Sequence, residues 1–403
     1  MDMFVLAVQI AMGLLAVCGM VYGLIALWAA RGFERAVKRA PRLENEPEAW
    51  PGVTILKPVK GVDARMYAGL VSHCRLAYAG EVELLFGVSS LEDPAVAEIA
   101  RLRVEFPKVD IRLVECPVQM GLNGKVSNLA QMVPRARFEY LIVNDSDIRV
   151  APQYLQRVMT PFAFSSDAQP VGLVTLPYVG RVGDGDGGGL WSKLESLGIS
   201  TEFMAGVLTA RKLEGGVKFG LGSTLATTKT ALGSIGGFES LVDELADDYE
   251  LGARLSAAGY RVELIAEVVE TSVPAYTLRG FCEHQLRWSR GVRDSRKAGS
   301  LGLGLTYMVP WALMAVVASA GELWSISLLS LALLVRYAVA LTVGVGVLND
   351  VQVLRFAWLL PLRDCFALFF WAWSYASDEV VWRGQRFKLK DGKLLKQTVE
   401  VRQ

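Results

Sequence analysis

Hydrophobic residues gather in long runs at the two ends of the chain, whereas the middle alternates short apolar runs with polar stretches. The first run covers residues 4–30 and contains no charged residue. A membrane-spanning helix needs about 20 such residues, so this run predicts an N-terminal transmembrane helix within 1–30. It is too long for a cleaved signal peptide, and no basic residue precedes it.

Two further apolar runs lie near the other end, at 303–321 and about 323–348. Each is long enough to cross a bilayer, so we expect two transmembrane helices within 301–350. Basic residues follow the first apolar run at once, at the start of 31–52, a segment that otherwise has the composition of a linker. By the positive-inside rule, this basic flank predicts that the domain beginning at residue 53 is cytosolic.

A fourth apolar run, 356–376, is interrupted by polar residues. Pro361 and an Arg-Asp pair stand in its middle. A full crossing there would also carry the basic tail, 379–403, out of the cytosol, against the positive-inside rule. We therefore expect an interfacial or re-entrant segment over 351–378.

Between these ends, residues 53–300 alternate β-rich runs with stretches of helical periodicity. The first three β-rich runs are 53–61, 82–90 and 109–115. Strands that alternate with helices of these lengths indicate an α/β domain with a largely parallel sheet. Ligands of such sheets bind at the carboxyl ends of the strands, so the catalytic and ligand-binding residues are expected there.

The apolar run that begins at Leu141 leads directly into Asp145, Ser146 and Asp147. Two carboxylates at the end of a strand can hold a hard divalent cation, Mg²⁺ or Mn²⁺, and leave open positions for a nucleotide diphosphate. Aspartate and serine also favour turns, so an ordinary strand-to-helix turn before Pro152 explains the same residues.

Two lysines stand where an anionic ligand would bind. Lys57 lies at the end of the first predicted strand and is a candidate for contact with the nucleotide or its diphosphate, or is simply solvated. Lys125 opens a predicted helix after Gly121 and Gly124. A helix N-terminus beside a lysine favours a phosphate, although a capped helix with an exposed lysine fits as well.

Acidic residues at two later helices are candidates for acid-base chemistry. Asp247 and Asp248 open a helical stretch, where they stabilise the helix or, if Asp248 faces the cleft, take the proton of an acceptor hydroxyl. Glu195 and Glu202 stand among apolar neighbours in the helical stretch 190–210. Either is a surface residue or a carboxylate near an acceptor hydroxyl.

A basic and aromatic helix is expected over 281–297. His284, Arg287 and Trp288 are three and four residues apart and therefore share one face. A cation and an indole on that face could grip a diphosphate and cover an acceptor. A basic amphipathic helix on an anionic membrane surface has the same composition.

Composition supports a membrane protein and excludes several classes. The chain is 52% hydrophobic and has a mean hydropathy of +0.33, which is high for a soluble protein. Its net charge of +1, without a nucleic-acid-binding motif, argues against a nucleic-acid partner. Five scattered cysteines without CxxC spacing imply neither zinc nor disulfides.

Taken together, the motifs resemble those of membrane-bound glycosyltransferases with the GT-A fold. The resemblance is strongest to the ceramide glucosyltransferase family, glycosyltransferase family 21, with the related hopanoid-associated glycosyltransferases, and it covers about residues 53–390. The motifs that carry it are ILKPVKG (55–61), GLNGKVSNL (121–129), NDSDIRV (144–150), ADDYELG (246–252), HQLRW (284–288) and VVWRGQRFKL (380–389).

The resemblance implies a UDP-sugar donor, a membrane lipid acceptor and inversion at the sugar. It implies that Asp145 binds the metal and the nucleotide sugar, and that Asp147 stands where some members have glycine. Asp248 matches the general base. The HQLRW motif matches the family's (Q/R)xxRW signature, with His284 in place of Gln or Arg. Ceramide is the first expected acceptor and a hopanoid polyol the second.

The chain departs from the family at one donor-binding position. Ser90 stands where the family's first aspartate is expected, and Glu92 or Asp93 could supply that carboxylate from a shifted loop. The histidine of some members has its nearest counterpart in Thr201 or Glu202. Two other classes therefore stay open: a catalytically inactive module that binds sugar nucleotides or lipids, and a transporter.

Overall fold

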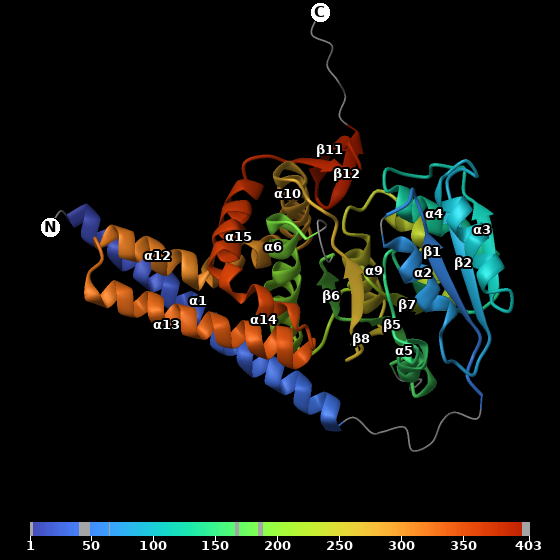
Figure 1. Cartoon of the computed structure of the whole chain (residues 1–403), viewed down its shortest axis with the longest axis horizontal. Coiled ribbons are helices and arrows are strands. Elements are labelled where there is room, and N and C mark those ends of the chain that lie inside the picture. Colours follow the sequence, from blue (N-terminus) through green and yellow to red (C-terminus); the bar gives the residue numbers. More distant parts are fainter. Residues whose placement is uncertain (1–2, 40–48, 64, 166–168, 184–187, 397–403) are drawn as a thin grey trace, which may run out of the picture. The chain divides into compact units, whose positions relative to one another are not determined.

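The computed structural model describes residues 3–39, 49–63, 65–165, 169–183 and 188–396 (Figure 1). Clustering of contacts divides the chain into two compact units. We call them the sheet unit, residues 41–181, 216–272 and 392–403, and the helical unit, residues 1–40, 182–215 and 273–391. Each is described by itself. Most of the predicted linker, 40–48, lies outside the described residues.

The sheet unit is built on a seven-stranded sheet with the strand order β3-β2-β1-β4-β7-β5-β8. Its strands are β1 (Val53–Pro58), β2 (Val82–Val88), β3 (Asp110–Glu115), β4 (Tyr140–Val143), β5 (Val171–Thr175), β7 (Leu225–Thr228) and β8 (Arg261–Leu264). Strands β3, β2, β1 and β4 pair in parallel, as do β5 and β8, whereas β7 is antiparallel to both of its neighbours. The predicted α/β fold with a largely parallel sheet is confirmed.

β7 starts only at Leu225, because the glycine-containing stretch before it forms a loop that packs on the helix opened by Asp247. There the Gly220 amide donates to the Asp248 carbonyl at 3.1 Å. This bond ties the backbone of Asp248 to the loop before β7.

Helices and a second, small sheet complete this unit. The helices are α2 (Met66–Cys74), α3 (Ala95–Glu105), α4 (Gly124–Met132), α5 (Tyr154–Ala163), α8 (Lys229–Ser234) and α9 (Asp247–Ala257), with the 3-10 turns η1 (Val133–Arg135) and η4 (Phe238–Leu241). Strands β6 (Tyr178–Arg181) and β9 (Val269–Ser272) pair in parallel. β12 is Lys393–Lys396. The central strands are buried along nearly their whole length, for example Ile55 and Leu56 in β1, as expected for a sheet covered on both faces.

The helical unit contains the apolar runs and also two segments that were predicted to belong to the α/β domain, 182–215 and 273–300. Its helices are α1 (Met3–Arg39), α6 (Leu190–Gly198), α7 (Met204–Leu213), α10 (Leu278–Ser295), α11 (Lys297–Leu303), α12 (Met308–Ala318), α13 (Leu323–Ala340), α14 (Gln352–Phe356) and α15 (Leu360–Ser374). Shorter elements are the π-helical turns η3 (Ile199–Phe203) and η6 (Leu341–Val347), the 3-10 turns η5 (Gly304–Thr306) and η7 (Ala357–Leu359), and the hairpin of β10 (Glu379–Trp382) and β11 (Gln385–Lys390).

Within the described residues, two helical segments are long and apolar enough to cross a membrane, Met3–Lys38 and Leu323–Val347. The span predicted at 303–321 is instead a bent pair, Lys297–Thr306 and Met308–Ala318, with a 51° angle between its parts. If that pair acts as one span, there are three. α15, with 15 residues, is shorter than these spans. The interfacial or re-entrant placement expected for 351–378 stays a prediction.

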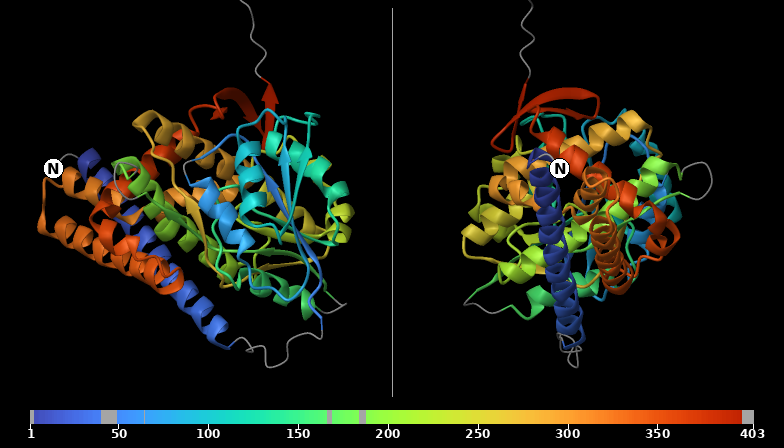
Figure 2. Two further views of the ribbon diagram at one scale, coloured as in Figure 1. Left: turned by 45° about the vertical axis from the view of Figure 1, so that its right-hand side comes forward. Right: turned by 90° about the vertical axis from the view of Figure 1, so that its left-hand side faces the viewer.

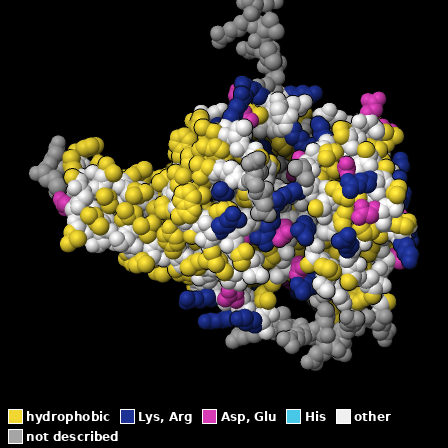
Figure 3. Space-filling model, in the orientation of Figure 1, with side chains coloured by type: hydrophobic (Ala, Val, Ile, Leu, Met, Phe, Trp, Pro, Cys, Tyr) yellow, Lys and Arg dark blue, Asp and Glu magenta, His cyan; other side chains and the backbone are white. Residues whose placement is uncertain are grey.

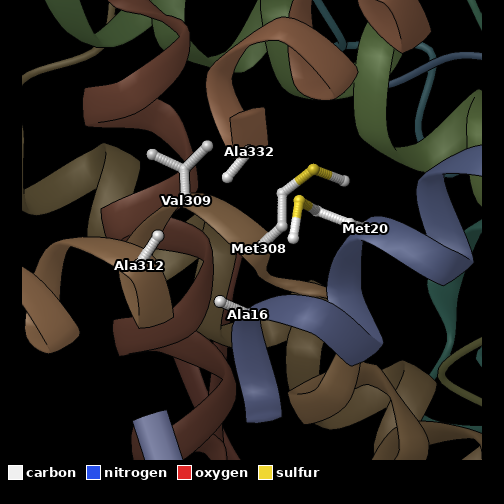
Figure 4. Close-up of a cluster of buried hydrophobic side chains, with 6 residues drawn as sticks. All are labelled: Ala16, Met20, Met308, Val309, Ala312 and Ala332. Carbon is white, nitrogen blue, oxygen red and sulfur yellow. The ribbon is translucent and has the colours of Figure 1, made fainter. Parts of the chain in front are cut away.

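Helices α1, α12 and α13 run alongside one another (Figure 2) and bury a cluster of small and flexible side chains. Ala16, Met20, Met308, Val309, Ala312 and Ala332 form it (Figure 4). Gly19 permits the approach of α1 to α12, because a Cβ atom there would lie 2.7 Å from the Met308 backbone. Hydrophobic side chains also cover much of the outer surface of these helices (Figure 3), as expected for helices that face lipid.

Two ion pairs lie among the buried residues of the helical unit that the structure describes. Arg336 of α13 donates to the Asp364 carboxylate at 2.8 Å, and both are buried. Arg363 lies 3.0 Å from Glu202 on η3. Buried charges of this kind are costly unless they are paired, so these contacts hold α13, α15 and η3 together.

Candidate active site

The acidic loop that follows β4 is anchored by Asn144, a residue that the sequence analysis did not single out. Asn144 is fully buried, and its Nδ2 donates to Thr224 Oγ1 and to the Ser223 carbonyl, each at 2.9 Å. These bonds tie the end of β4 to the start of β7. Asp145 is therefore presented at the carboxyl end of the parallel part of the sheet, where the α/β topology predicts a ligand.

Lys57 is buried, whereas the predicted contact with a nucleotide would require an exposed side chain. Its side chain is fully buried, and Nζ donates to the Asp145 carbonyl at 3.0 Å. Burial lowers the pKa of Lys57 to about 7, although Asp147 and Asp145 act in the opposite direction. Lys57 thus supports the acidic loop through this hydrogen bond, and its buried position does not suit contact with a nucleotide.

Asp147 is also engaged in the fold. Its Oδ2 accepts hydrogen bonds from Thr271 Oγ1 at 2.6 Å and from the Ser272 amide at 2.9 Å. Burial raises the pKa of Asp147, and the neighbouring Asp145 raises it further. One carboxylate oxygen of Asp147 therefore binds the end of β9, which makes this residue a poorer metal ligand than predicted.

The N-terminus of α4 is fixed to the segment that precedes α9. Asn123 caps α4 by accepting from the Val126 amide at 3.2 Å. Its Nδ2 donates to the Glu244 carbonyl at 2.9 Å and to Asp247 Oδ1 at 3.3 Å. The cap residue thereby brings Lys125 and Asp247, far apart in the sequence, to one place.

Lys125 lies at the centre of a carboxylate cluster. Its Nζ is 2.8 Å from Asp145 Oδ1 and 3.6 Å from Asp247 Oδ2. Burial acts to lower the pKa of Lys125, but Asp145, Asp247 and Asp248 overcome this effect and raise it above the ordinary value. The ammonium group is therefore firmly charged at neutral pH. Asp145 itself is the more open partner, with 41% of its side chain exposed.

Asp248 joins the same cluster. Burial raises the pKa of Asp248 to about 6, with a further contribution from Asp247, while Lys125 acts to lower it. Asp145 also raises this pKa, as expected of a second carboxylate nearby. The two acidic segments, separated by about 100 positions in the sequence, therefore meet in the sheet unit.

The loop after β2 uses its acidic residue for main-chain contacts. Both carboxylate oxygens of Asp93 accept from the Gly61 amide, at 2.9 and 3.0 Å, and Oδ1 also accepts from the Ala95 amide at 2.9 Å. Asp93 therefore holds the loop after β1 and is occupied structurally. Ser90 and Glu92 are exposed, so Glu92 is the freer of the two carboxylates predicted near Ser90.

The basic and aromatic motif belongs to the helical unit, on α10. His284 Nε2 lies 3.1 Å from Glu195 Oε1, and Arg287 Nη2 lies 3.3 Å from His284 Nδ1. The Trp288 ring packs on His284, with centroids 5.3 Å apart, and on Phe203 at 5.6 Å. The three motif residues thus share one face, as their spacing predicts, and Glu195 is part of that face.

The donor set of the sheet unit is compatible with a divalent cation that takes most of its ligands from a substrate. Among the described residues no three His, Cys, Asp or Glu side chains form a closed metal site. Asp145 offers a partly exposed carboxylate, whereas Asp147 has one oxygen committed to Thr271 and Ser272. Mg²⁺ in particular is commonly bound by one or two carboxylates together with phosphate oxygens and water.

Known proteins resemble this chain over most of its length. Ceramide glucosyltransferase 1 of Caenorhabditis elegans is 23% identical over 366 residues, which cover 87% of this chain and 74% of that protein. Ceramide glucosyltransferase 3 of the same organism is 27% identical over 245 residues, which cover 60% of this chain and 51% of that protein.

Among solved structures, a mannosyltransferase from Pyrobaculum calidifontis, in complex with GDP-Man and Mn²⁺, has a TM-score of 0.53 at 18% identity. The match covers 92% of this chain and 98% of that one, and the likeness confirms the expected GT-A glycosyltransferase fold. The sequence profile of glycosyl transferase family 21 matches residues 11–395. The chain therefore belongs to glycosyl transferase family 21.

Proposed function

We propose that this protein is a membrane-bound enzyme that transfers a sugar from a UDP-sugar to a hydroxyl group of a lipid, with inversion at the anomeric carbon. The observation that carries the proposal is the position of Asp248. Burial raises the pKa of Asp248 to about 6, near neutral pH, and the charges of Lys125 and Asp145 act on this carboxyl group. Lys125 and Asp145 are themselves 2.8 Å apart at the end of β4. A general base works best when its pKa is close to the working pH.

In this mechanism Asp248 removes the proton of the acceptor hydroxyl. The oxygen then attacks the anomeric carbon from the face opposite to the diphosphate, which inverts the configuration without a covalent enzyme intermediate. Lys125 supplies positive charge to the departing diphosphate, since its ammonium group stays protonated among the carboxylates. Arg287 is the second candidate for this role, as a guanidinium can bind two phosphate oxygens at once.

Asp145 would hold a divalent cation, Mg²⁺ or Mn²⁺, with Asp147 as a weaker contributor. When bound, such a cation supplies charge that stabilises the diphosphate leaving group. The support for this assignment is the exposed carboxylate of Asp145 at the carboxyl end of β4.

The acceptor is proposed to be a ceramide, with a hopanoid polyol as the second candidate. Both C. elegans relatives carry the name ceramide glucosyltransferase, which favours ceramide and a glucosyl donor. The apolar helices Met3–Lys38 and Leu323–Val347 support a location in the membrane, where either lipid would be found. The basic flank after residue 30 supports a cytosolic catalytic domain.

The test is transfer by the purified protein. It is supplied with isotope-labelled UDP-sugars, Mg²⁺ or Mn²⁺, and vesicles that contain ceramide, a hopanoid polyol or neither. A glycolipid of the expected mass, formed together with UDP only when one acceptor is present, supports the proposal and identifies that acceptor. Binding of UDP-sugar with no release of UDP under any of these conditions overturns it in favour of an inactive binding module.

A further inference from the structure

The hydrogen-bond partners of His284 determine its tautomer. Glu195 Oε1 lies 3.1 Å from Nε2. On the other side of the ring, Tyr276 Oη lies 3.2 Å and Arg287 Nη2 lies 3.3 Å from Nδ1. Because an ionised carboxylate only accepts hydrogen bonds, Nε2 must carry a proton. Because a guanidinium only donates, Nδ1 must be unprotonated and accept from Arg287. In its neutral form, His284 therefore carries its proton on Nε2.

Glu195 is well placed to impose this tautomer. Only 4% of its side chain is exposed, and its second oxygen accepts from Gln285 Nε2. Burial acts to raise the pKa of Glu195, but the contact with His284, which includes a hydrogen bond from the ring, and more weakly the cations Arg363 and Arg287, lower it below the ordinary value. The residue is thus an anion with both oxygens used as acceptors. Neither oxygen can donate to the ring.

The tautomer of His284 in turn affects its hydrogen bond with Arg287. The guanidinium has the imidazole Nδ1 on one side and lies over the Trp382 ring at 5.9 Å on another. If the proton of His284 moved to Nδ1, the ring would present a donor to the guanidinium, and this contact would be lost. The contact between Arg287 and His284 therefore depends on the ring proton that Glu195 holds on Nε2.

We propose that Glu195 is a positioning residue for the transfer reaction and acts through His284 to hold Arg287 ready for the donor diphosphate. This inference rests on the proposed function for the role of Arg287. In a chain that has glutamine or arginine at the position of His284, a tautomer need not be selected. Here, the histidine at the start of the motif has a buried carboxylate on α6 that selects its tautomer.

The tautomer can be measured without any assay of activity, because the chain contains only two histidines. His73 Nδ1 lies 2.9 Å from the Gly69 carbonyl, whereas Nε2 lies 3.4 Å from Asn144 Oδ1. The shorter contact favours a proton on Nδ1, the opposite of His284. Nitrogen NMR of the full-length protein with labelled histidine, assigned with a His284→Gln variant, should show one ring of each tautomer. Two rings protonated on Nδ1, or a His284 ring protonated on both nitrogens at neutral pH, would overturn the proposal.

The Glu195→Gln variant tests the consequence. A glutamine has only one oxygen for the two donors, Nε2 of His284 and Nε2 of Gln285, so the tautomer of His284 is no longer imposed. We expect His284 to become a mixture of tautomers, and kcat/KM for the UDP-sugar to fall roughly 10–100-fold, as when a partner that orients a functional histidine is removed. The matched control is Glu283→Gln on α10, which removes the same charge from a residue that is paired with the exposed Arg279.

A double-mutant cycle separates positioning from a structural role. If Glu195 acts through His284, then Glu195→Gln should cost little further activity in the His284→Gln background. An equal loss in both backgrounds would mean that Glu195 only packs α6 against α10, and the proposal would be wrong. If the wild-type protein shows no transfer, the proposed function fails, whereas the NMR result still decides whether Glu195 sets the tautomer.

Discussion

Lys125 Nζ lies 2.8 Å from Asp145 Oδ1, which joins the N-terminus of α4 to the carboxyl end of β4. Asn123 caps α4 and donates to Asp247, which brings a third segment, at the start of α9, to 3.6 Å from the same ammonium group. One lysine thus balances carboxylates from two other segments of the chain. The same ammonium charge lowers the pKa of Asp248, against the effects of burial and of Asp247 and Asp145.

The activity should depend on pH through Asp248. Because the folded protein raises the pKa of Asp248 to about 6, the carboxylate gains a proton as the pH falls through this value. A protonated Asp248 cannot accept the proton of an acceptor hydroxyl, so kcat/KM should fall with an acid limb near pH 6. The pH profile of transfer measures this directly. An acid limb near the ordinary aspartate pKa would exclude Asp248 as the base.

The Lys125→Met variant should move that acid limb to higher pH. Lys125 lowers the pKa of Asp248, whereas Asp247 and Asp145 raise it, so removal of the cation leaves the carboxylates to repel one another. The expected result is a limb above pH 6 together with a weaker affinity for the UDP-sugar. An acid limb at the same pH in this variant would show that Lys125 does not affect the pKa of Asp248.

Asp145 and Asp147 should respond differently to amidation. Asp145→Asn should raise the concentration of Mg²⁺ or Mn²⁺ needed for half-maximal activity, because the exposed carboxylate is lost. Asp147→Asn should instead lower the free energy of unfolding by about 1–3 kcal/mol, because the Thr271 and Ser272 donors lose a charged acceptor. Metal titrations and denaturant unfolding of both variants distinguish the two roles. Equal metal requirements in both variants would contradict this division.

Lys57 should make folding stability depend on pH. Its pKa falls from 10.5 to about 7 on folding, so between these values the unfolded chain holds a proton that the folded chain has lost. Stability contributed by this group is therefore present above the upper value and is lost as the pH falls toward about 7. Thermal unfolding of the wild type and of Lys57→Met, followed between about pH 7 and pH 10, should show that only the wild type gains this increment. A constant difference between the two proteins would contradict the lowered pKa.

Much of the fold could be predicted because it follows from periodicity and the ends of elements. The alternation of β-rich runs and helices predicts the parallel strands β3, β2, β1 and β4 and places Asp145 at the carboxyl end of β4. The antiparallel pairing of β7 and its start at Leu225 could not be predicted in the same way. They depend on the packing of the Gly220 loop against Asp248, a contact between distant segments.

The sequence indicates which residues could carry chemistry, but not which side chains support the backbone. Lys125 lies 2.8 Å from Asp145, and both affect the pKa of Asp248, while the roles of these three residues stay predictions. Lys57 and Asn144 follow the same kind of pattern, yet both are buried and hold the loop from within. A polar side chain at the end of a strand can point into the core or toward the ligand site. Only the packing around it determines which of the two it does.

Glu195 shows a different limit. Its sequence neighbourhood is that of an ordinary amphipathic helix, and its partner His284 lies 89 positions away. The available signal was the histidine itself, which occupies the place of Gln or Arg in the motif and needs an acceptor for its N–H group.

The central claim is that Asp248 is the base for transfer to a lipid, and the Asp248→Asn variant tests it most directly. The measurement is the rate of lipid-dependent UDP release and glycolipid formation by the full-length wild type and this variant, with Glu250→Gln on the same helix as the control. The account predicts a folded, membrane-bound Asp248→Asn protein that still binds the UDP-sugar and transfers at no more than about a hundredth of the wild-type rate, while the control retains its activity. Wild-type turnover in the Asp248→Asn variant would contradict it.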